Sequence, residues 1–274
     1  MLHPGLYEQV INNTLNSELL EVPEVRKSTA PIDAAEASKV LAQYLTDVVQ
    51  KGLENVQDNG GGIEAQIQLA NEIVSTIQTT THEPNFALLG VDQRAEQLLA
   101  LLRDNDPRLA AGKSAKEMVR PETSIAQSSL FTGAIHEPQM YTELKKEIVS
   151  ADRIDMLVSF IKWSGLRLIM DELRQFTQNG GELRIITTSY MDVKAIEELR
   201  QLPNTKIKVS YDTKRTRLHA KTYVFYRNTG FTTAYVGSSN LSNAAISSGL
   251  EWNVKVTKKD LTETIDKIAA TFES

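Results

Sequence analysis

Residues 217–225 read RLHAKTYVF, residues 236–240 read VGSSN and residues 250–253 read LEWN. The first run is rich in Thr, Tyr, Val and Phe, which favours a β-strand. Because side chains alternate between the two faces of a strand, we expect His219 and Lys221 to project from the same face. An imidazole beside a fixed cation suits the binding of a phosphate group.

The two shorter runs follow this strand in the sequence and supply further polar groups. The turn at residues 227–230 leads into a second β-rich run, residues 231–236, so the two strands are expected to form a hairpin. Gly237, with small donor side chains after it, lets backbone and side-chain groups approach an anion closely. Glu251 opens a third apolar run and is a candidate for orienting the imidazole of His219.

Each run also has an ordinary structural explanation. A His-x-Lys in a strand is commonly a half-exposed surface edge, and Gly-Ser-Ser-Asn is commonly a turn. The three runs together, in this order, indicate a site that handles phosphodiesters.

The order His-x-Lys and then Gly-Ser-x-Asn on the next strand resembles the signature of the phospholipase D superfamily. That superfamily includes phospholipases, metal-independent nucleases, some restriction endonucleases and modules attached to helicases. The resemblance implies that His219 is the nucleophile, and that Lys221 and Asn240 bind phosphate oxygens. It further implies that Ser238 and Glu251 support these residues, and that a phosphohistidine intermediate forms without a metal or cofactor.

Two departures from the superfamily pattern bear on the mechanism. Tyr226 stands where the superfamily usually has a structural Asp, five residues after the Lys. The superfamily's chemistry uses two histidines, one as nucleophile and one as acid for the leaving oxygen. This sequence has one His-x-Lys, and members with one copy pair two chains. The resemblance therefore implies a homodimer in which two copies of His219 share one active site.

Charge is distributed unevenly along the chain. The net charge is −5, but residues 1–120 carry 10 of the 30 basic and 17 of the 35 acidic residues. The rest is slightly basic, and one cluster precedes the His-x-Lys run: Lys206, Lys208, Lys214, Arg215 and Arg217. A solvated loop is one explanation of this cluster. The other is a patch in which Lys214, Arg215 and Arg217 bind the phosphate backbone of DNA.

Composition excludes several classes of protein. The 274 residues include no Cys, so disulfides and thiolate metal sites are excluded. His3, His82 and His136 lack the partner spacing of a metal site. No apolar run approaches the roughly 20 residues of a membrane helix, and the first residues do not read as a signal peptide. We therefore expect a cytoplasmic protein without membrane contact.

Residues 1–118 are predicted to form a helical amino-terminal domain. Apolar stripes predict helices over Gly5–Glu21, from Asp33 to Val56 and over Ile63–Ile77, and a short helix after Asp92. Asp33 and Glu36 have the spacing of a capping box at the start of the second helix. The stripes indicate the packed core of a helical bundle.

Residues 119–274 are predicted to form the phospholipase D-like domain. Helical and strand patterns alternate here, with a buried strand over Ile154–Ile161 and one helix over Gly165–Gln178. A last helix is expected to be capped by Asp260. The fold class is thus α+β or α/β: a helical bundle followed by a mixed β-sheet flanked by helices on both faces.

The resemblance extends over nearly the whole chain. The segments Leu130–Gly133, Ser150–Asp155 and Ser159–Leu166, with the His-x-Lys site, look like the amino-terminal region of a bacterial superfamily II helicase group. In that group a phospholipase D-like domain precedes the ATPase motor. The chain has no Gly-x-x-x-x-Gly-Lys-Ser/Thr loop, so a motor domain would have to belong to a longer or a partner chain.

Three functions are compatible with the sequence. The first is a metal-independent DNA phosphodiesterase that acts with a helicase, and the second is a silent module that binds or targets nucleic acid. The third, a lipid phosphodiesterase, is disfavoured because the sequence has no basic amphipathic helix or apolar interfacial patch.

Overall fold

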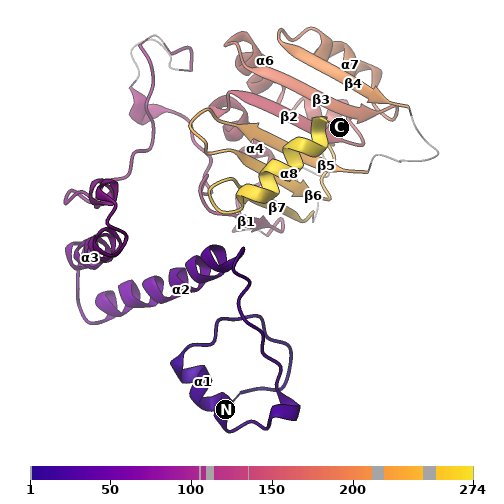
Figure 1. Cartoon of the computed structure of the whole chain (residues 1–274). Helices are drawn as coiled ribbons and strands as arrows, with labels where there is room; N and C mark the ends of the chain where they lie inside the picture. Colours follow the sequence, from indigo (N-terminus) through magenta and orange to yellow (C-terminus); the bar gives the residue numbers. More distant parts are fainter. Residues whose placement is uncertain are drawn as a thin grey trace. The chain divides into compact units, whose positions relative to one another are not determined.

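The chain forms two compact units, Met1–Leu99 and Ala100–Ser274 (Figure 1). The computed structural model describes residues 2–104, 106–108, 114–134, 136–211, 219–242 and 251–273. The predicted domain boundary after residue 118 stays a prediction.

The amino-terminal unit is helical. Its elements are α1 (Asn13–Leu20), the 3₁₀-helix η1 (Glu24–Arg26), α2 (Ala37–Asp58), α3 (Ile63–Thr81) and the 3₁₀-helix η2 (Pro84–Leu89). The predictions of α2 and α3 are confirmed. The two helices join through a tight turn in which Gly61 N donates to Val56 O at 2.9 Å. A Cβ on Gly61 would lie 2.6 Å from Val56 Cγ1, so the turn requires glycine.

Three predicted helix starts are wrong. In each case a side-chain oxygen accepts from a nearby backbone N–H, and it either caps the helix at a later residue or forms a turn. α1 begins at Asn13 and not at Gly5, since Asn12 Oδ1 accepts from Leu15 N at 2.9 Å. The capping box does not form, because Asp33 Oδ1 accepts from Ala35 N and α2 starts after Glu36. Asp92 Oδ1 likewise accepts from Arg94 N in a turn, and no described residue from 92 to 104 is helical.

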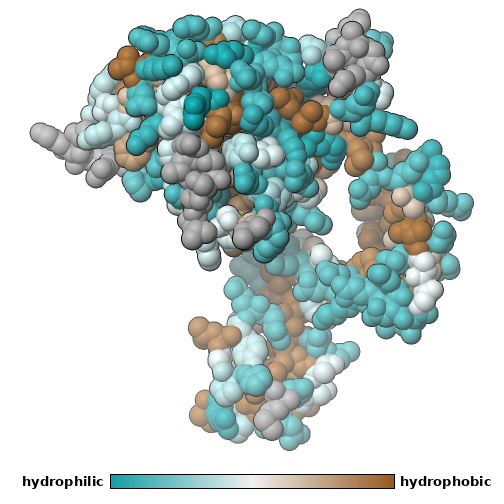
Figure 2. Space-filling view, turned by 180° about the vertical axis from the view of Figure 1, so that it is seen from behind, coloured by the Kyte–Doolittle hydropathy of each residue, from teal (hydrophilic) through white to brown (hydrophobic). Residues whose placement is uncertain are grey.

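The amphipathic stripes of this unit do not form a closed core. None of its described residues, 2–99, is buried. Leu41, Leu45 and Val48 of α2 are 42%, 53% and 45% exposed. Hydrophobic side chains accordingly appear on the surface of this unit (Figure 2). The predicted helices α1, α2 and α3 are thus present and the one predicted after Asp92 is not, and the predicted packing among the helices is not seen in the described part of the unit.

The carboxyl-terminal unit alternates strands and helices. Its helices are η3 (Ala115–Glu117), α4 (Met140–Ser150), α5 (Trp163–Leu166), α6 (Met170–Gln178), α7 (Val193–Arg200) and α8 (Thr262–Glu273). Its strands are β1 (Ser129–Phe131), β2 (Arg153–Val158), β3 (Glu182–Thr188), β4 (Thr205–Ser210), β5 (Lys221–Tyr226), β6 (Thr233–Gly237) and β7 (Asn253–Thr257).

The strands form one mixed sheet in the order β1-β7-β6-β5-β2-β3-β4. The pairs β2–β3 and β3–β4 are parallel, and the remaining pairs are antiparallel. Alternation along β5 divides the core. Tyr223 and Phe225 pack in the main cluster with side chains of α4, α6 and α7, whereas Val224 packs with Ile265 of α8 on the opposite face (Figure 1). A mixed sheet with helices on both faces, as predicted, is confirmed.

Local boundaries in this unit differ from the sequence prediction in four places. The single helix predicted over Gly165–Gln178 is two helices, because the backbone at Ile169 leaves the helical region with φ −121° and ψ 5°. β2 ends at Val158, and Ile161 makes isolated bridges instead of continuing the strand. The short strand β1 was not predicted. Asp260 Oδ2 accepts from Ser128 N at 3.1 Å, and α8 begins at Thr262.

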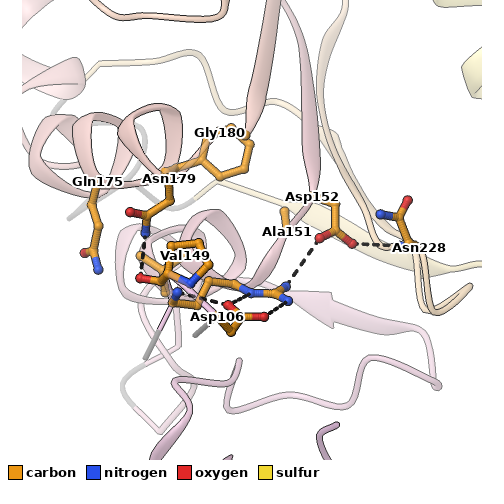
Figure 3. A pocket seen from close by; sticks show the side chains of 12 residues that line it. Asp106, Val149, Ala151, Asp152, Gln175, Asn179, Gly180 and Asn228 are labelled. Carbon is orange, nitrogen blue, oxygen red and sulfur yellow. Dashed lines mark hydrogen bonds and ion pairs between the residues drawn. The ribbon is translucent and has the colours of Figure 1, made fainter. Parts of the chain in front are cut away.

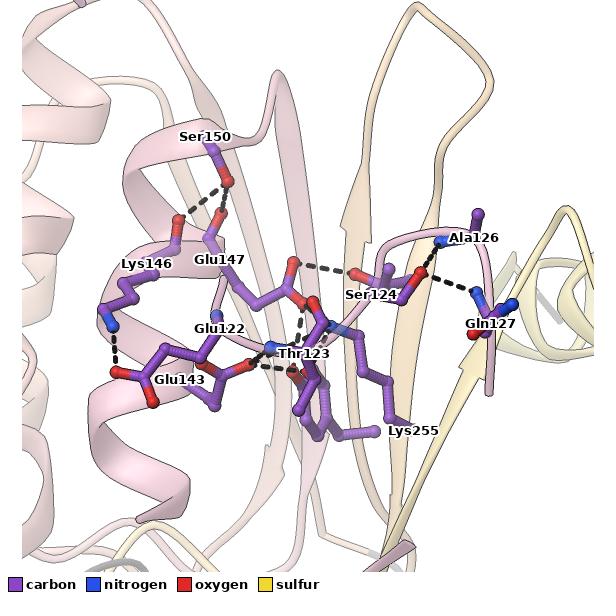
Figure 4. A network of polar contacts seen from close by, with 12 residues as sticks. Glu122, Thr123, Ser124, Ala126, Gln127, Glu143, Lys146, Glu147, Ser150 and Lys255 are labelled. Atoms are coloured by element: carbon purple, nitrogen blue, oxygen red, sulfur yellow. Dashed lines mark hydrogen bonds and ion pairs between the residues drawn. The ribbon is translucent and has the colours of Figure 1, made fainter. Parts of the chain in front are cut away.

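A buried network of charges ties α4 to the sheet (Figure 4). Glu147 accepts from Arg227 Nη2 at 2.6 Å and from Lys255 Nζ at 2.9 Å, and the side chains of these three residues are almost fully buried. Tyr235 Oη also donates to Glu147 at 3.0 Å. Burial raises the pKa of the Glu147 carboxyl, but the two cations outweigh burial and hold that pKa below its usual value.

No helix in the described part of the chain is long and apolar enough to cross a membrane.

Candidate active site

The residues predicted to form the site meet at one edge of the sheet. Val158 at the end of β2 pairs with Lys221 at the start of β5, and Gly237 at the end of β6 pairs with Asn253 at the start of β7. The loops after β2 and β6 and before β5 and β7 therefore leave the sheet side by side. All five predicted catalytic residues lie in or beside these loops: His219, Lys221, Ser238, Asn240 and Glu251.

His219 and Lys221 are in direct contact. Lys221 Nζ lies 3.2 Å from His219 Nδ1 and 3.3 Å from Nε2, and it donates to His219 O at 3.0 Å. The predicted shared face of the two side chains is thus seen, although β5 begins at Lys221 and His219 precedes it. Lys221 is 7% exposed, and burial lowers the pKa of its ammonium. A partly desolvated cation in this position interacts strongly with an anion.

The charge of Glu251 acts on Lys221. This negative charge raises the pKa of Lys221 and so opposes the effect of burial, which remains the larger of the two. Among the described residues no hydrogen bond joins the Glu251 carboxylate to the ring of His219, so this structure gives Glu251 an electrostatic part beside Lys221.

The loop after β6 is held against the start of β7. Ser238 N donates to Trp252 O at 3.1 Å, and Trp252 N donates to Ser238 Oγ at 3.2 Å. A Cβ on Gly237 would lie 2.2 Å from Trp252 O, so this close approach requires glycine. Ser238 is exposed, which leaves its hydroxyl at the surface of the site.

Buried side chains fix the backbone between Ser238 and Asn240. Tyr223 Oη donates to Ser239 O at 3.0 Å, and Asn253 Nδ2 donates to Ser239 Oγ at 2.7 Å. Ser239, Tyr223 and Asn253 are each at most 2% exposed. Sequence pattern did not predict a role for these three residues. The strand alternation that pairs His219 with Lys221 also places Tyr223 on the same face, and this was the available signal.

Asn240 is oriented by the loop after β2. Phe160 N donates to Asn240 Oδ1 at 3.2 Å. Because the acceptor end of the amide is used in this way, its Nδ2 is the end that can donate to a ligand. Gly165 lets these loops pack, since a Cβ there would lie 2.5 Å from the backbone of Ser242.

Tyr226 lies at the far end of β5 from the site. The guanidinium of Arg153 lies 3.8 Å from the centre of its ring. A cation–π contact therefore occupies the position where the superfamily usually has Asp, and it lies five strand residues from Lys221.

The predicted DNA-binding residues Lys214, Arg215 and Arg217 lie outside the described residues. Of their neighbours, Lys206 pairs with Glu182 at 2.8 Å.

A cavity of about 270 Å³ lies at the other end of β2, away from the site (Figure 3). Arg108 in its wall pairs with Asp106 at 2.8 Å and with Asp152 at 3.3 Å, and Asn228 N donates to Asp152 at 2.7 Å. These contacts attach residues 106–108 to the start of β2. The charged groups of this cavity are paired with one another, so we assign it a structural role.

Within the described ranges, no group of three or more His, Asp or Glu residues could hold a metal ion.

A comparison with family models finds a match over part of the chain. A family model described as "Cardiolipin synthase, PLD-like domain" matches residues 144–274. This part of the chain is therefore similar in sequence to a phospholipase D-like domain. No curated protein matches the chain.

Several solved structures resemble the chain at low identity. NucT from Helicobacter pylori is 23% identical with a TM-score of 0.43, and covers 54% of this chain and 93% of its own. Nuc from Salmonella typhimurium, a phospholipase D family member, is 18% identical with a TM-score of 0.40 and the same two coverages. Yeast tyrosyl-DNA phosphodiesterase is 16% identical with a TM-score of 0.33, and covers 47% of this chain and 31% of its own.

Proposed function

We propose, from the phospholipase D-like domain in residues 144–274, that the chain is a metal-independent phosphodiesterase that cleaves DNA through a phosphohistidine intermediate. The observation that carries the proposal is the contact of Lys221 Nζ with the ring of His219, at the same sheet edge as the oriented amide of Asn240. A nucleophile, a cation and a neutral donor then surround the position of one phosphate.

The reaction proceeds in two steps. A ring nitrogen of His219 attacks phosphorus and forms the N–P bond, while the bond from phosphorus to the leaving oxygen breaks and that oxygen takes a proton from a second imidazolium. The second imidazole then removes a proton from water, which attacks phosphorus and returns the electron pair of the N–P bond to His219. Lys221 and Asn240 donate to the non-bridging oxygens and stabilise the charge that develops on them.

The second imidazole comes from another copy of the chain. The supporting observation is an uncovered row of apolar side chains beside the site. Leu130, Val254 and Val236 pair across β1, β7 and β6, and each is between 38% and 46% exposed. α8 covers the next row, which includes Ala234 and Val256. An isologous contact through the uncovered row would bring two copies of this sheet edge together.

The test is a plasmid-nicking assay in excess EDTA, with His219→Ala as the control. Cleavage that persists in EDTA and disappears in the variant supports the proposal. Cleavage that requires added magnesium contradicts it. An acid-quenched reaction with a labelled oligonucleotide should also leave the label on the wild-type protein and not on the variant.

Subunit mixing tests the shared site. When wild type and His219→Ala are mixed in equal amounts and allowed to exchange, about one quarter of the dimers keep both histidines. Activity per total protein should therefore fall to about one quarter of the wild-type value, and not to one half. Light scattering that shows a monomer at every concentration would refute the dimer.

The alternative function is a catalytically silent module that binds or targets nucleic acid. The observation that favours it is the single His-x-Lys, because one chain can hold a phosphate with Lys221 and Asn240 without completing a cleavage site. DNA binding with steep salt dependence and without cleavage at any pH or metal would support this function.

The cellular setting is also part of the proposal. The segments Leu130–Gly133 and Ser159–Leu166 resemble the accessory amino-terminal region of bacterial helicases, which supports a role beside a helicase motor in the same or a partner chain. We place this role in the cytoplasm, where such a motor meets DNA.

A further inference from the structure

Three loops run in register along the sheet edge that carries the site. Ile161, after β2, makes parallel bridges to Met191 on one side and to Leu241 on the other. Asp192 N donates to Ile161 O at 3.0 Å, and Lys162 N donates to Leu241 O at 2.9 Å. The residues that precede the three bridging positions therefore also lie in a row: Tyr190, Phe160 and Asn240. Neighbouring members of such a row are about 5 Å apart, measured from one backbone to the next across the sheet.

Two of the three residues form an aromatic pair. The ring centres of Phe160 and Tyr190 are 5.9 Å apart, and the rings are inclined at 72°. Tyr190 is 59% exposed, whereas Phe160 is half-buried. An exposed aromatic ring that rests on a second ring presents a flat apolar surface to solvent.

Hydrogen bonds hold the loop of Tyr190 in place. Thr188 Oγ1 donates to Ser159 O at 2.6 Å and accepts from Tyr190 N at 3.3 Å. Phe160 is itself tied to the site, since its backbone N–H orients Asn240. The pair is thus positioned before any ligand binds, which lowers the entropic cost of a contact with it.

We propose that Phe160 and Tyr190 form a stacking platform for an unpaired nucleobase, so that the substrate is a single-stranded nucleic acid. This inference rests on the proposed function, because it takes Lys221 and Asn240 to hold the phosphate. The platform lies one and two chain spacings, about 5 and 10 Å, from Asn240, the distance over which a sugar and base extend from their phosphate. A base within a duplex is already stacked and paired, so it would have to leave the duplex to reach this platform.

The chemistry of the platform defines the preference further. Every base has a π-face, so stacking on Tyr190 tolerates any sequence. A lipid phosphodiester has no planar group beside its phosphate and gains no stacking here. We therefore expect binding that requires bases but does not distinguish among them.

The test compares binding of a short oligothymidylate with binding of an abasic strand of the same length, by fluorescence anisotropy at fixed salt. Wild type should bind the oligothymidylate more tightly than it binds the abasic strand. Tyr190→Ala should weaken this binding about tenfold, since stacking contributes about 1–3 kcal/mol per base, and should leave abasic binding unchanged. Tyr190→Phe keeps the ring and should bind like wild type. Val193→Ala removes an exposed apolar side chain three residues away and serves as the matched control.

The outcomes separate this inference from the proposed function. If Tyr190→Ala weakens both strands equally, or neither, there is no stacking platform, whatever the protein cleaves. If the loss is confined to the base-containing strand but no strand is ever cleaved, the platform stands and the phosphodiesterase proposal fails. If a blunt duplex binds to the wild type as tightly as the single strand does, the inference is also overturned.

Discussion

The two units of the chain carry amphipathic helices of the same kind and bury them differently. In the carboxyl-terminal unit, Leu144 and Ile148 of α4 are almost inaccessible because the sheet provides a broad apolar surface opposite them. In the amino-terminal unit, a tight turn joins α2 to α3, and none of the residues of these helices is buried. Periodicity therefore predicts a helix in both units, but burial requires a second surface that the helix itself does not encode.

The largest contrast between the units is expected in catalysis. His219→Ala in the carboxyl-terminal unit should lower DNA cleavage by at least about a thousandfold, because the covalent step is lost, while the phosphate ligands remain. The urea midpoint should not change. Tyr44→Ala in α2 is the control and should leave the cleavage rate within about twofold of wild type. A comparable loss in both variants would mean that the two units build the site together.

Removal of a buried charge is the next largest effect. Glu147→Gln leaves Arg227 and Lys255 without their carboxylate in a region closed to water, and should cost about 3–5 kcal/mol in the free energy of unfolding. Asp266→Asn breaks the exposed pair with Lys258 and should cost less than about 1 kcal/mol. Urea denaturation of both variants measures the difference. Equal costs would show that the interior of the carboxyl-terminal unit is not the dry environment described here.

Truncation of apolar side chains compares the two units directly. Ile154→Ala in β2 empties a fully buried position and should destabilise the carboxyl-terminal unit by about 2–5 kcal/mol. Leu45→Ala in α2 removes a side chain that is 53% exposed and should cost less than about 1 kcal/mol. Chemical denaturation followed by circular dichroism gives both values. A large cost for Leu45→Ala would show that α2 is covered in solution by a partner or by a second copy.

The smallest of these effects is expected in the dependence of stability on acidic pH, through Glu147 of the carboxyl-terminal unit. The pKa of Glu147 is lower in the folded protein than in the unfolded chain, so its contribution to stability is complete above the unfolded value of about 4.3. That contribution is lost as the pH falls through the lower, folded pKa. The urea midpoint of the wild type should therefore fall in this acidic range, and the midpoint of Glu147→Gln should fall less steeply. If the urea midpoints of the wild type and of Glu147→Gln fall in parallel as the pH is lowered, Glu147 is not the source of the acid sensitivity.

The sequence predicted those features that depend on local pattern. Alternation along the strand predicted that His219 and Lys221 project from the same face, and an apolar run predicted β2. β1 was missed because its three residues carry too little pattern, and its partner β7 lies more than a hundred residues later. Phe160 and Ser239 were missed because their contacts with the site join loops that are far apart in the sequence.

The order of strands in the sheet has a consequence for biosynthesis. β2 and β3 are close in sequence and can pair early, but β5 to β7, which carry most of the site, join the sheet across longer intervals of chain. β1 is made near residue 130 and must wait for β7 near residue 255. Until β5 and β7 have been synthesised, β2 and β1 thus have edges without partners. During this interval the chain is most exposed to misfolding. The phosphate site is therefore one of the last features to form.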